Sequence, residues 1–314
     1  MIIIDAIQSA LTILFMIGIG YFLTHKGWFD QSTSKLFSRF VINVALPFLM
    51  VTNLLKRFNK EMLMASGTRL LIPYAVVILT YGIGMIVSRL LKIPDKRRSL
   101  FETMFALSNT MFIGLPVNIA LFGDESVPYV LLYFIANTTI FWTFGVYSIR
   151  KSATGEGGHI FTKETLKKIF SPPLIAFIIS IGFILTGIRP PRFIMDGFKY
   201  IGSTTTALSM IFIGITIYDL DFSEIKIDKS MIALLCGRFI VCPLLAFVIV
   251  YYFPAPSLMK KVFVIESAMP VMTNTAIVAQ AYKSDYKYAT VMVSVSIMAS
   301  LIIIPFYRVI VSML

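Results

Sequence analysis

Runs of about 20 apolar residues recur along the whole chain, and short charged segments separate them. The hydrocarbon core of a bilayer is roughly 30 Å thick, so a helix of about 20 apolar residues spans it. A mean hydropathy of +0.84 agrees with a chain that lies in lipid. The runs predict an all-α membrane protein without a soluble domain, with ten spans at 6–24, 36–54, 70–88, 99–122, 127–149, 171–188, 198–218, 231–252, 262–282 and 288–307. The first run lacks a basic start and is full length, so it is expected to be a span and not a signal peptide.

The positive charge of the chain is expected to set its orientation in the membrane. The formal net charge is +12, but Lys and Arg are spread over short loops and form no basic stripe, which argues against a nucleic-acid partner. Sixteen of them fall in the loops 25–35, 89–98, 150–168, 219–229 and 283–287, and ten in the opposite set. Because cytoplasmic loops carry the excess of Lys and Arg, both termini are expected outside a multi-pass cell membrane protein.

The sequence offers little support for an enzyme or a metal site. The cysteines Cys236 and Cys242 lie six residues apart on one expected helix, so they face different directions and are unsuited to a mutual disulfide. The histidines His25 and His159 fall in loops, and no phosphate loop or nucleophile motif is present. No cofactor is therefore expected.

The polar segment 150–168 divides the chain into two halves of five spans, 1–150 and 169–314, joined by a cytoplasmic loop at 151–168. An odd number of spans in a duplicated half requires the two copies to enter the membrane in opposite orientations. The order Arg, Pro, Glu, Pro recurs in the third and fourth spans and again in the eighth and ninth, as Arg69, Pro73, Glu102 and Pro116, and as Arg238, Pro243, Glu266 and Pro270.

The fourth and ninth spans each contain residues that interrupt a helix. SNTMFIGLPVN (108–118) places Gly114 and Pro116 in the middle of one apolar run, and ESAMPVMTNTA (266–276) places Pro270 and Asn274 in the other. Proline disfavours helical geometry at the residue before it, so the fourth span is expected to break at Leu115. Irregular backbone at membrane depth is tolerated where protein buries it or where it lines a wet cavity, so these breaks predict a transport site. The other intramembrane prolines are interpreted as simple kinks: Pro47, Pro73, Pro243 and Pro305.

These motifs resemble the auxin efflux carrier family. NTMFIGLP (109–116) is similar to the family's fourth-span motif and AMP (268–270) to its ninth-span Ala-Leu-Pro, with Met269 in place of Leu; Gly20-Tyr21 and NVALPFL (43–49) are similar to bacterial members. The resemblance implies two inverted five-helix repeats whose broken fourth and ninth helices cross, as in sodium/proton antiporters and bile-acid symporters. It implies a scaffold block of spans 1, 2, 6 and 7, and a transport block of spans 3–5 and 8–10. It also implies transport of small organic anions such as malate, malonate or auxin-like acids, and the short loop at 150–168 disfavours auxin itself.

Two groups of residues are candidates for the site. The resemblance implies substrate contact for Asn109, Pro116 and Pro270. Side-chain chemistry adds Asn118, Thr273 and Asn274, because their amides and hydroxyl can hold a carboxylate without a buried charge. Asn43 either faces the same cavity or bonds a neighbouring helix. Packing or supporting roles are expected for Asn137, Thr138, Thr139, Ser294 and Ser296.

Four ionisable residues are candidates for coupling or gating. Glu102 and Glu266 are expected in the first turns of their helices, where the helix dipole favours a carboxylate and the interface is within reach. Arg69 and Glu266 should lie near the outer face, and Arg238 and Glu102 near the inner face, which permits ion pairs between the halves. The sequence does not distinguish H⁺ from Na⁺ as coupling ion.

Three alternatives stay open. The chain is a carrier of organic anions working by alternating access of the elevator type, a sodium-coupled symporter of the bile-acid type, or a membrane sensor that binds its ligand without moving it. The expected partners are the anion, the lipid bilayer and a second copy of the chain that pairs through the scaffold spans. Substrate, direction of transport and coupling are not distinguished by the sequence.

Overall fold

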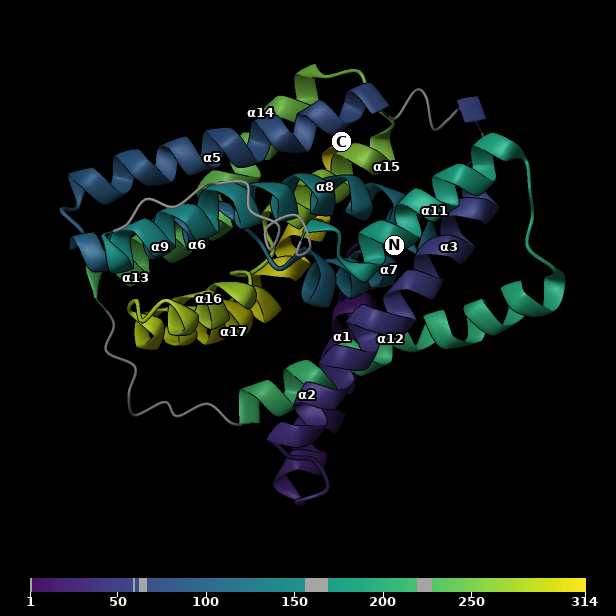
Figure 1. Cartoon of the computed structure of the whole chain (residues 1–314), viewed down its shortest axis with the longest axis horizontal. Coiled ribbons are helices and arrows are strands. Elements are labelled where there is room, and N and C mark those ends of the chain that lie inside the picture. The colour runs from purple at the N-terminus through teal and green to yellow at the C-terminus, as the bar shows by residue number, and fades with distance from the viewer. Residues whose placement is uncertain (1, 59, 62–66, 156–168, 219–227) are drawn as a thin grey trace.

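A computed structural model describes residues 2–58, 60–61, 67–155, 169–218 and 228–314 (Figure 1). Over these ranges the regular structure is helical apart from one isolated antiparallel bridge, so the predicted all-α class is confirmed. The elements are α1 (Ile2–His25), α2 (Gln31–Phe40), η1 (Val41–Ala45), α3 (Leu46–Arg57), η2 (Thr68–Leu70), α5 (Leu71–Leu90), α6 (Asp95–Ala106), η3 (Thr110–Gly114), α7 (Leu115–Phe122), η4 (Asp124–Ser126), α8 (Val127–Ile140), η5 (Phe141–Gly145), α9 (Val146–Thr154), α11 (Pro172–Thr186), α12 (Arg192–Tyr218), α13 (Lys229–Cys236), η7 (Gly237–Val241), α14 (Cys242–Tyr252), α15 (Ser257–Ser267), α16 (Asn274–Ala281), α17 (Tyr286–Ile310) and η8 (Val311–Met313).

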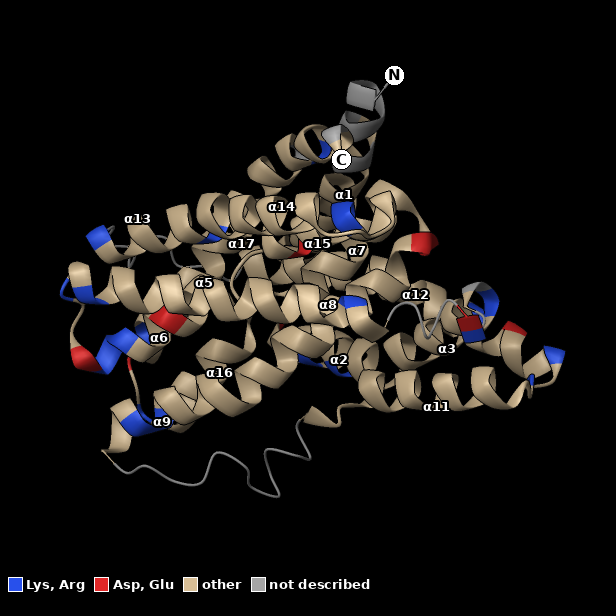
Figure 2. Ribbon diagram, turned by 90° about the horizontal axis from the view of Figure 1, so that it is seen from above, with Lys and Arg blue, Asp and Glu red and all other residues tan. Residues whose placement is uncertain are grey.

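Within the described ranges, six continuous helical segments are long and apolar enough to cross a membrane: Gln31–Lys56, Thr68–Leu90, Asp124–Thr154, Arg192–Tyr218, Lys229–Tyr252 and Tyr286–Ile304. They coincide with six of the expected spans. The expected spans at 6–24 and 171–188 appear as α1 and the shorter α11, and those at 99–122 and 262–282 are each broken. Charged residues fall mostly at helix ends, and most of the ribbon in the middle of the molecule is made of uncharged residues (Figure 2).

Three intramembrane prolines follow a π-helical turn. Pro47, Pro116 and Pro243 are each the second residue of an α-helix that continues from η1, η3 or η7. Proline lacks an N–H and its ring clashes with the carbonyl four residues earlier, and a π-turn, which bonds over five residues, relieves both problems. The expected break at Leu115 is therefore wrong: Leu115 is helical at φ −62°, ψ −52°, and the chain leaves the helix at Leu107, with φ −104° and ψ 130°.

The two other prolines interpreted as kinks, Pro73 and Pro305, lie inside regular helices. Pro73 falls in the first turn of α5, where its missing N–H removes no helical hydrogen bond, and Pro305 lies within α17, which continues past it. The expected loop at 151–168 falls mainly outside the described residues, since the description stops at residue 155 and resumes at residue 169.

Helices α1 and α12 cross at a pair of glycines. A Cβ atom on Gly20 would lie 2.3 Å from the Ile211 carbonyl oxygen, and one on Gly214 would lie 2.1 Å from the Ile17 carbonyl oxygen. The two backbones therefore touch at a distance that only glycine permits. Helix α12 also packs along α3, and α3 along α11, which joins these four helices into one group.

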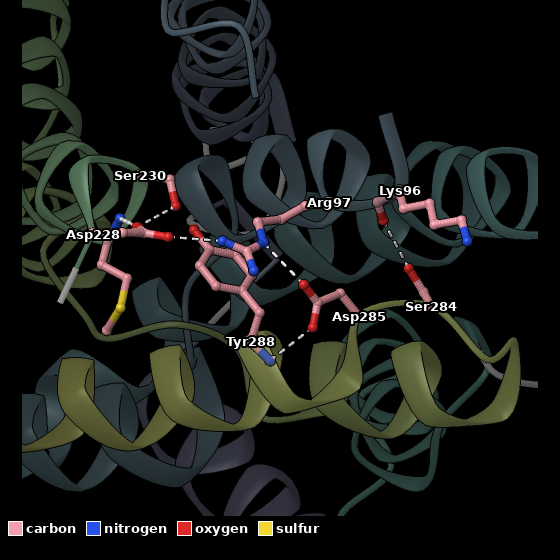
Figure 3. Close-up of polar contacts among 8 residues, drawn as sticks. Lys96, Arg97, Asp228, Ser230, Ser284, Asp285 and Tyr288 are labelled. Carbon is pink, nitrogen blue, oxygen red and sulfur yellow. Dashed lines mark hydrogen bonds and ion pairs between the residues drawn. The ribbon is translucent and has the colours of Figure 1, made fainter. Parts of the chain in front are cut away.

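An arginine links the first turns of three helices (Figure 3). Arg97 of α6 pairs through Nη1 with Asp228 at 2.8 Å and through Nε with Asp285 at 2.9 Å, and its guanidinium lies over the Tyr288 ring. Asp228 and Asp285 are the N-caps of α13 and α17. Burial acts to raise the pKa of Asp228, but hydrogen bonds from Ser230 and the Met231 amide and the charge of Arg97 outweigh it and hold that pKa below its usual value.

Candidate functional site

The two interrupted helices meet at their breaks. Helix α6 ends at Ala106 and η3 begins at Thr110; α15 ends at Ser267 and α16 begins at Asn274. The connecting segments run antiparallel through a bridge between Ser108 and Val271, and the Asn109 N–H donates to the Pro270 carbonyl at 2.8 Å. Pro270 thus lies in the irregular segment, as predicted for the ninth span.

Neighbouring helices hold both connecting segments. Asn137 of α8 donates to the Ser108 carbonyl at 2.9 Å and accepts from the Ser108 N–H at 3.0 Å. Ser296 of α17 accepts from the Val271 N–H at 3.1 Å. Unpaired backbone groups are costly at membrane depth, so these bonds are what allow the chain to be irregular here. The expected supporting roles of Asn137 and Ser296 are confirmed by these contacts.

Arg238 binds the C-terminal ends of the two half-helices, α6 and α15, at the crossing. Its side chain is completely buried, with Nη1 donating to the Phe105 carbonyl at 2.9 Å and Nη2 donating to the Ser267 carbonyl. These carbonyls belong to the last turns of α6 and α15, where backbone acceptors lack helical partners and the helix dipole is negative. One guanidinium therefore caps two half-helices.

Arg238 and Glu102, which the sequence allows to pair, are each bound to other groups. Arg238 lies at the crossing instead of near the inner face, and Glu102 accepts from Ser88 Oγ of α5 at 2.6 Å. No ion pair joins the two across the residues that the structure describes. Arg238 is therefore bound to backbone carbonyls of the two half-helices and not to a carboxylate.

The expected position of Glu266 is also wrong. Glu266 lies in the last turn of α15 and is completely buried, because α15 begins at Ser257, directly after Pro256, and not at the apolar run. Its Oε1 accepts from Asn118 Nδ2 at 2.7 Å. Arg69 lies partly exposed in η2, and no ion pair with Glu266 is found among the described residues. Glu102 is likewise in the third turn of α6, not the first, since that helix begins at Asp95.

A cavity of about 140 Å³ opens beside the crossing. Its lining includes Asn109, Thr273 and Asn274, so three of the candidate residues come together there. The other lining residues are Ile42, Leu46, Ser108, Thr110, Met111, Phe112, Phe134, Thr138, Trp142, Ser171, Pro173 and Met272.

The remaining candidates lie elsewhere. Pro116, Asn118 and Pro270 are buried behind the cavity lining. Asn43 is exposed and donates to the Arg39 carbonyl of its own helix at 2.7 Å, so neither expectation for it is met. A polar residue of an apolar helix can always turn back onto its own helix, which a sequence does not reveal.

Thr138, for which the sequence predicts a packing or supporting role, lines the cavity. Thr138 is buried, and its Oγ1 has no hydrogen-bond partner among the described residues although it lies beside the cavity. The signal in the sequence is its position next to Asn137, which faces the crossing. The aromatic lining residues Phe112, Phe134 and Trp142 carry no such signal, because aromatic side chains are common throughout this apolar chain.

The cavity combines neutral polar groups with two helix starts. None of the described residues that line it carries a charge. The Asn109 side chain accepts from the Phe112 N–H at 3.2 Å and donates to Thr273 Oγ1 at 2.8 Å, at the N-terminal ends of η3 and α16. No group of three or more His, Cys, Asp or Glu gathers within the described part of the chain. The arrangement is suited to binding a small polar solute.

Long apolar helices, two of them broken at a buried crossing beside a small cavity, define a multi-pass membrane transporter. Residues 5–308 match the family model described as membrane transport protein. The chain belongs to this family, the auxin efflux carriers that its motifs resemble, which is a family of transporters and not of enzymes.

Curated relatives share almost the full length. An uncharacterized transporter of Methanothermobacter thermautotrophicus is 27% identical over 99% of this chain and 100% of its own length. The uncharacterized transporter MJ1031 of Methanocaldococcus jannaschii is 24% identical over 94% of this chain and 95% of its own. The uncharacterized transporter YfdV of Escherichia coli K12 is 20% identical over 96% of each.

Proposed function

We propose that the protein is a secondary transporter of small organic anions, such as malate, malonate or auxin-like acids, across the cell membrane. The observation that carries this proposal is the uncharged cavity at the N-terminal ends of η3 and α16. Helix N-termini carry partial positive charge and free N–H groups, which favour anions. The negative ends of α6 and α15 are covered by Arg238. The local field therefore favours an anion without a fixed charge in the cavity.

The size of the cavity supports a small substrate. Pockets for drug-sized ligands measure roughly 300–1,000 Å³, and this one measures about 140 Å³. Its polar groups are the amides and hydroxyls of Asn109, Thr138, Thr273 and Asn274, suited to carboxylate oxygens, and its walls are aromatic and aliphatic. A short carboxylic acid satisfies both features.

The proposed architecture is ten spans in two inverted repeats, 1–150 and 169–314. Corresponding contacts support it: Ser108 faces Val271 in the bridge, and each connecting segment is held by a helix that follows it, through Asn137 in the first half and Ser296 in the second. The mutual packing of α1, α3, α11 and α12 supports a scaffold block distinct from a transport block built of the other spans. Sliding of the second block against the first gives alternating access of the elevator type.

The orientation follows from the loop charges. With both termini outside, the segment between α9 and α11 is cytoplasmic, and the lining residues Trp142 and Ser171 lie toward that side. The cavity accordingly faces the cytoplasm. An apolar groove of about 490 Å³ between α3, α11 and α12, which includes Phe48, Ala176 and Phe198, offers the scaffold a surface for lipid or for the proposed homodimer.

The test is uptake of radiolabelled malonate, malate and indole-3-acetate into proteoliposomes, with and without pH and sodium gradients. Asn109→Ala removes an amide beside the cavity; a hydrogen bond to a charged group contributes about 1.5–3 kcal/mol, so KM should rise roughly 10- to 100-fold. Asn43→Ala is the matched control and should transport like the wild type, since among the described residues the Asn43 side chain bonds only the Arg39 carbonyl of its own helix.

Three results would change the assignment. Equal loss in both variants would refute the cavity as the substrate site. Uptake that depends on a sodium gradient would favour the symporter of the bile-acid type. Thermal stabilisation by one of the anions, without transport of any, would favour a sensor.

A further inference from the structure

Two buried oxygen atoms beside the crossing lack hydrogen-bond donors. Glu266 Oε1 accepts from Asn118 Nδ2, but Glu266 Oε2 has no partner among the described residues. Asn118 Oδ1, on the other side chain of the same pair, has none either. Both side chains are completely buried. Buried acceptors are normally satisfied, so this pair requires an explanation.

The orientation of the Asn118 amide is fixed by its neighbours. Its Nδ2 donates to the Gly114 carbonyl at 2.9 Å as well as to Glu266 Oε1, which uses both of its hydrogens. Turning the amide over would place its oxygen against two acceptors. Asn118 therefore presents an acceptor, and a single hydrogen on Glu266 Oε2 that is donated to Asn118 Oδ1 would satisfy both oxygens and close a two-bond amide–acid pair.

The surroundings of Glu266 disfavour an ionised carboxylate. The residue lies at the C-terminal end of α15, where the helix dipole opposes negative charge. A backbone turn, not a cation, covers the carboxyl group, since a Cβ atom on Gly114 would lie 2.5 Å from both of its oxygens. A buried charge without a paired cation is strongly unfavourable.

The ionisable groups around α15 do not supply a partner. Arg238 of η7 directs Nη1 and Nη2 to the carbonyls of Phe105 and Ser267, and no ion pair links it to Glu266 in the described ranges. The other ionisable groups on elements packed against α15 are exposed or directed elsewhere. The exposed ones are Tyr251 and Tyr252 of α14, Tyr286 and Lys287 of α17, and Asp124 and Glu125 of η4. Of the rest, Cys242 of α14 bonds the Phe105 carbonyl, Tyr307 of α17 bonds the Phe239 carbonyl, Arg308 lies over the Phe122 ring, Tyr288 lies against Arg97, and Tyr129 and Tyr133 of α8 supply no cation.

The acid is connected to the cavity through one π-turn. The Gly114 N–H donates to the Asn109 carbonyl at 3.0 Å, and the Gly114 carbonyl accepts from Asn118. Asn109 lines the cavity, whereas Asn118 holds Glu266. A shift of η3 on binding of a solute at Asn109 would therefore change the contact between Asn118 and the acid.

We propose that Glu266 is a proton-carrying site, held as a neutral carboxylic acid by Asn118, and that it couples anion transport to proton movement. In one cycle the acid O–H bond breaks, water on the side to which the crossing opens takes the proton, and the carboxylate is protonated again from the other side. One proton carried with a monoanion makes the transport electroneutral, whereas one proton carried with a dianion such as malonate leaves one net negative charge moved per cycle. The coupling rests on the proposed transport function; the protonated state of Glu266 does not.

The first experiment reads the protonated acid directly, by infrared spectroscopy of the purified full chain in lipid vesicles at neutral pH, in H₂O and D₂O. We expect a carboxylic acid C=O band that is lost in Glu266→Gln and that shifts to higher frequency in Asn118→Leu, which removes the amide partner. Glu102→Gln is the matched control, because it makes the same change in the other half-helix and should leave this band in place. The wild-type spectrum in H₂O and D₂O is informative even if a variant does not fold.

Absence of any such band in the wild type would overturn the proposal. A band that sodium chloride abolishes, while potassium chloride does not, would make the site a sodium site and would overturn it as well. In both cases malonate uptake can still be found, so the outcome is separate from the transport assay.

The second experiment tests coupling with radiolabelled malonate in proteoliposomes. The wild type should accumulate malonate when a pH gradient is imposed. Glu266→Gln is a permanent mimic of the neutral acid. It should accumulate at least tenfold less malonate than the wild type, while it still exchanges external for internal malonate. Accumulation that the variant retains in full would refute the coupling. No malonate movement by the wild type, together with the infrared band, would count against the proposed function and leave the protonated acid established.

Discussion

Replacing Arg238 tests the double cap at the crossing. Arg238→Met keeps the length and the apolar stem of the side chain but removes the donors to the Phe105 and Ser267 carbonyls. A hydrogen bond from a charged group contributes about 1.5–3 kcal/mol, so the loss of two predicts a destabilisation of about 3–6 kcal/mol. Cys242 Sγ still donates to the Phe105 carbonyl at 3.2 Å, which places the expected value toward the lower end.

The assay is thermal unfolding in detergent micelles, followed by tryptophan fluorescence. At roughly 2 °C per kcal/mol for a chain of this length, Tm should fall by about 6–12 °C. Arg238→Lys should lose about half as much, because one ammonium group does not span two carbonyls as a guanidinium fork does. Arg89→Met is the matched control: Arg89 is exposed and donates to the Met85 carbonyl of its own helix, so its loss should change the stability by less than about 0.5 kcal/mol. A Tm for Arg238→Met that matches the control would refute the cap as a stabilising contact.

Three further changes test contacts outside the cavity. Gly20→Ala should destabilise the protein by about 1–3 kcal/mol, since the new methyl group meets a backbone carbonyl, whereas Gly18→Ala on the same helix meets nothing within 4 Å and should be neutral in the same Tm assay. Asn137→Leu should cost about 2–4 kcal/mol because it leaves a buried N–H and C=O unpaired; an unchanged Tm would contradict this. Arg97→Gln should cost about 1 kcal/mol at neutral pH. The lowered pKa of Asp228 means that its contribution is complete above the ordinary value of 3.8 and is lost as the pH falls through the lower folded pKa, so Tm should fall less with acid in this variant than in the wild type.

The sequence was sufficient for the helices and for the region of the crossing. Hydropathy is a strong signal because every span must bury its backbone in lipid, and the match of six long helices to expected spans reflects this. Proline and asparagine inside an apolar run marked Pro270 and Asn109 for the same reason. The place of the fourth-span break was missed by several residues, because a π-turn accommodates Pro116 within the helix.

The polar contacts at the crossing were beyond reach of the sequence. Arg238 binds backbone carbonyls 133 and 29 residues away in the chain. Every residue has a backbone carbonyl, so residue types do not indicate which ones an arginine will bind. The depth of Glu266 depends on where α15 begins, which Pro256 sets and hydropathy does not. The side chain of Asn137 faces the crossing, whereas that of Asn43 turns back onto its own helix. This difference depends on helix rotation, which a nearly uniform apolar sequence leaves undetermined.

The π-turn η3 absorbs one residue without turning the helix that follows it. A π-turn holds one residue more than an α-turn, so the deletion of one residue between Thr110 and Gly114 would convert it to an ordinary α-turn and leave α7 facing the same way. The insertion of one further residue would not be absorbed and would rotate everything after it by about 100°. Asn118 would then point away from Glu266, although no residue at the crossing had been substituted.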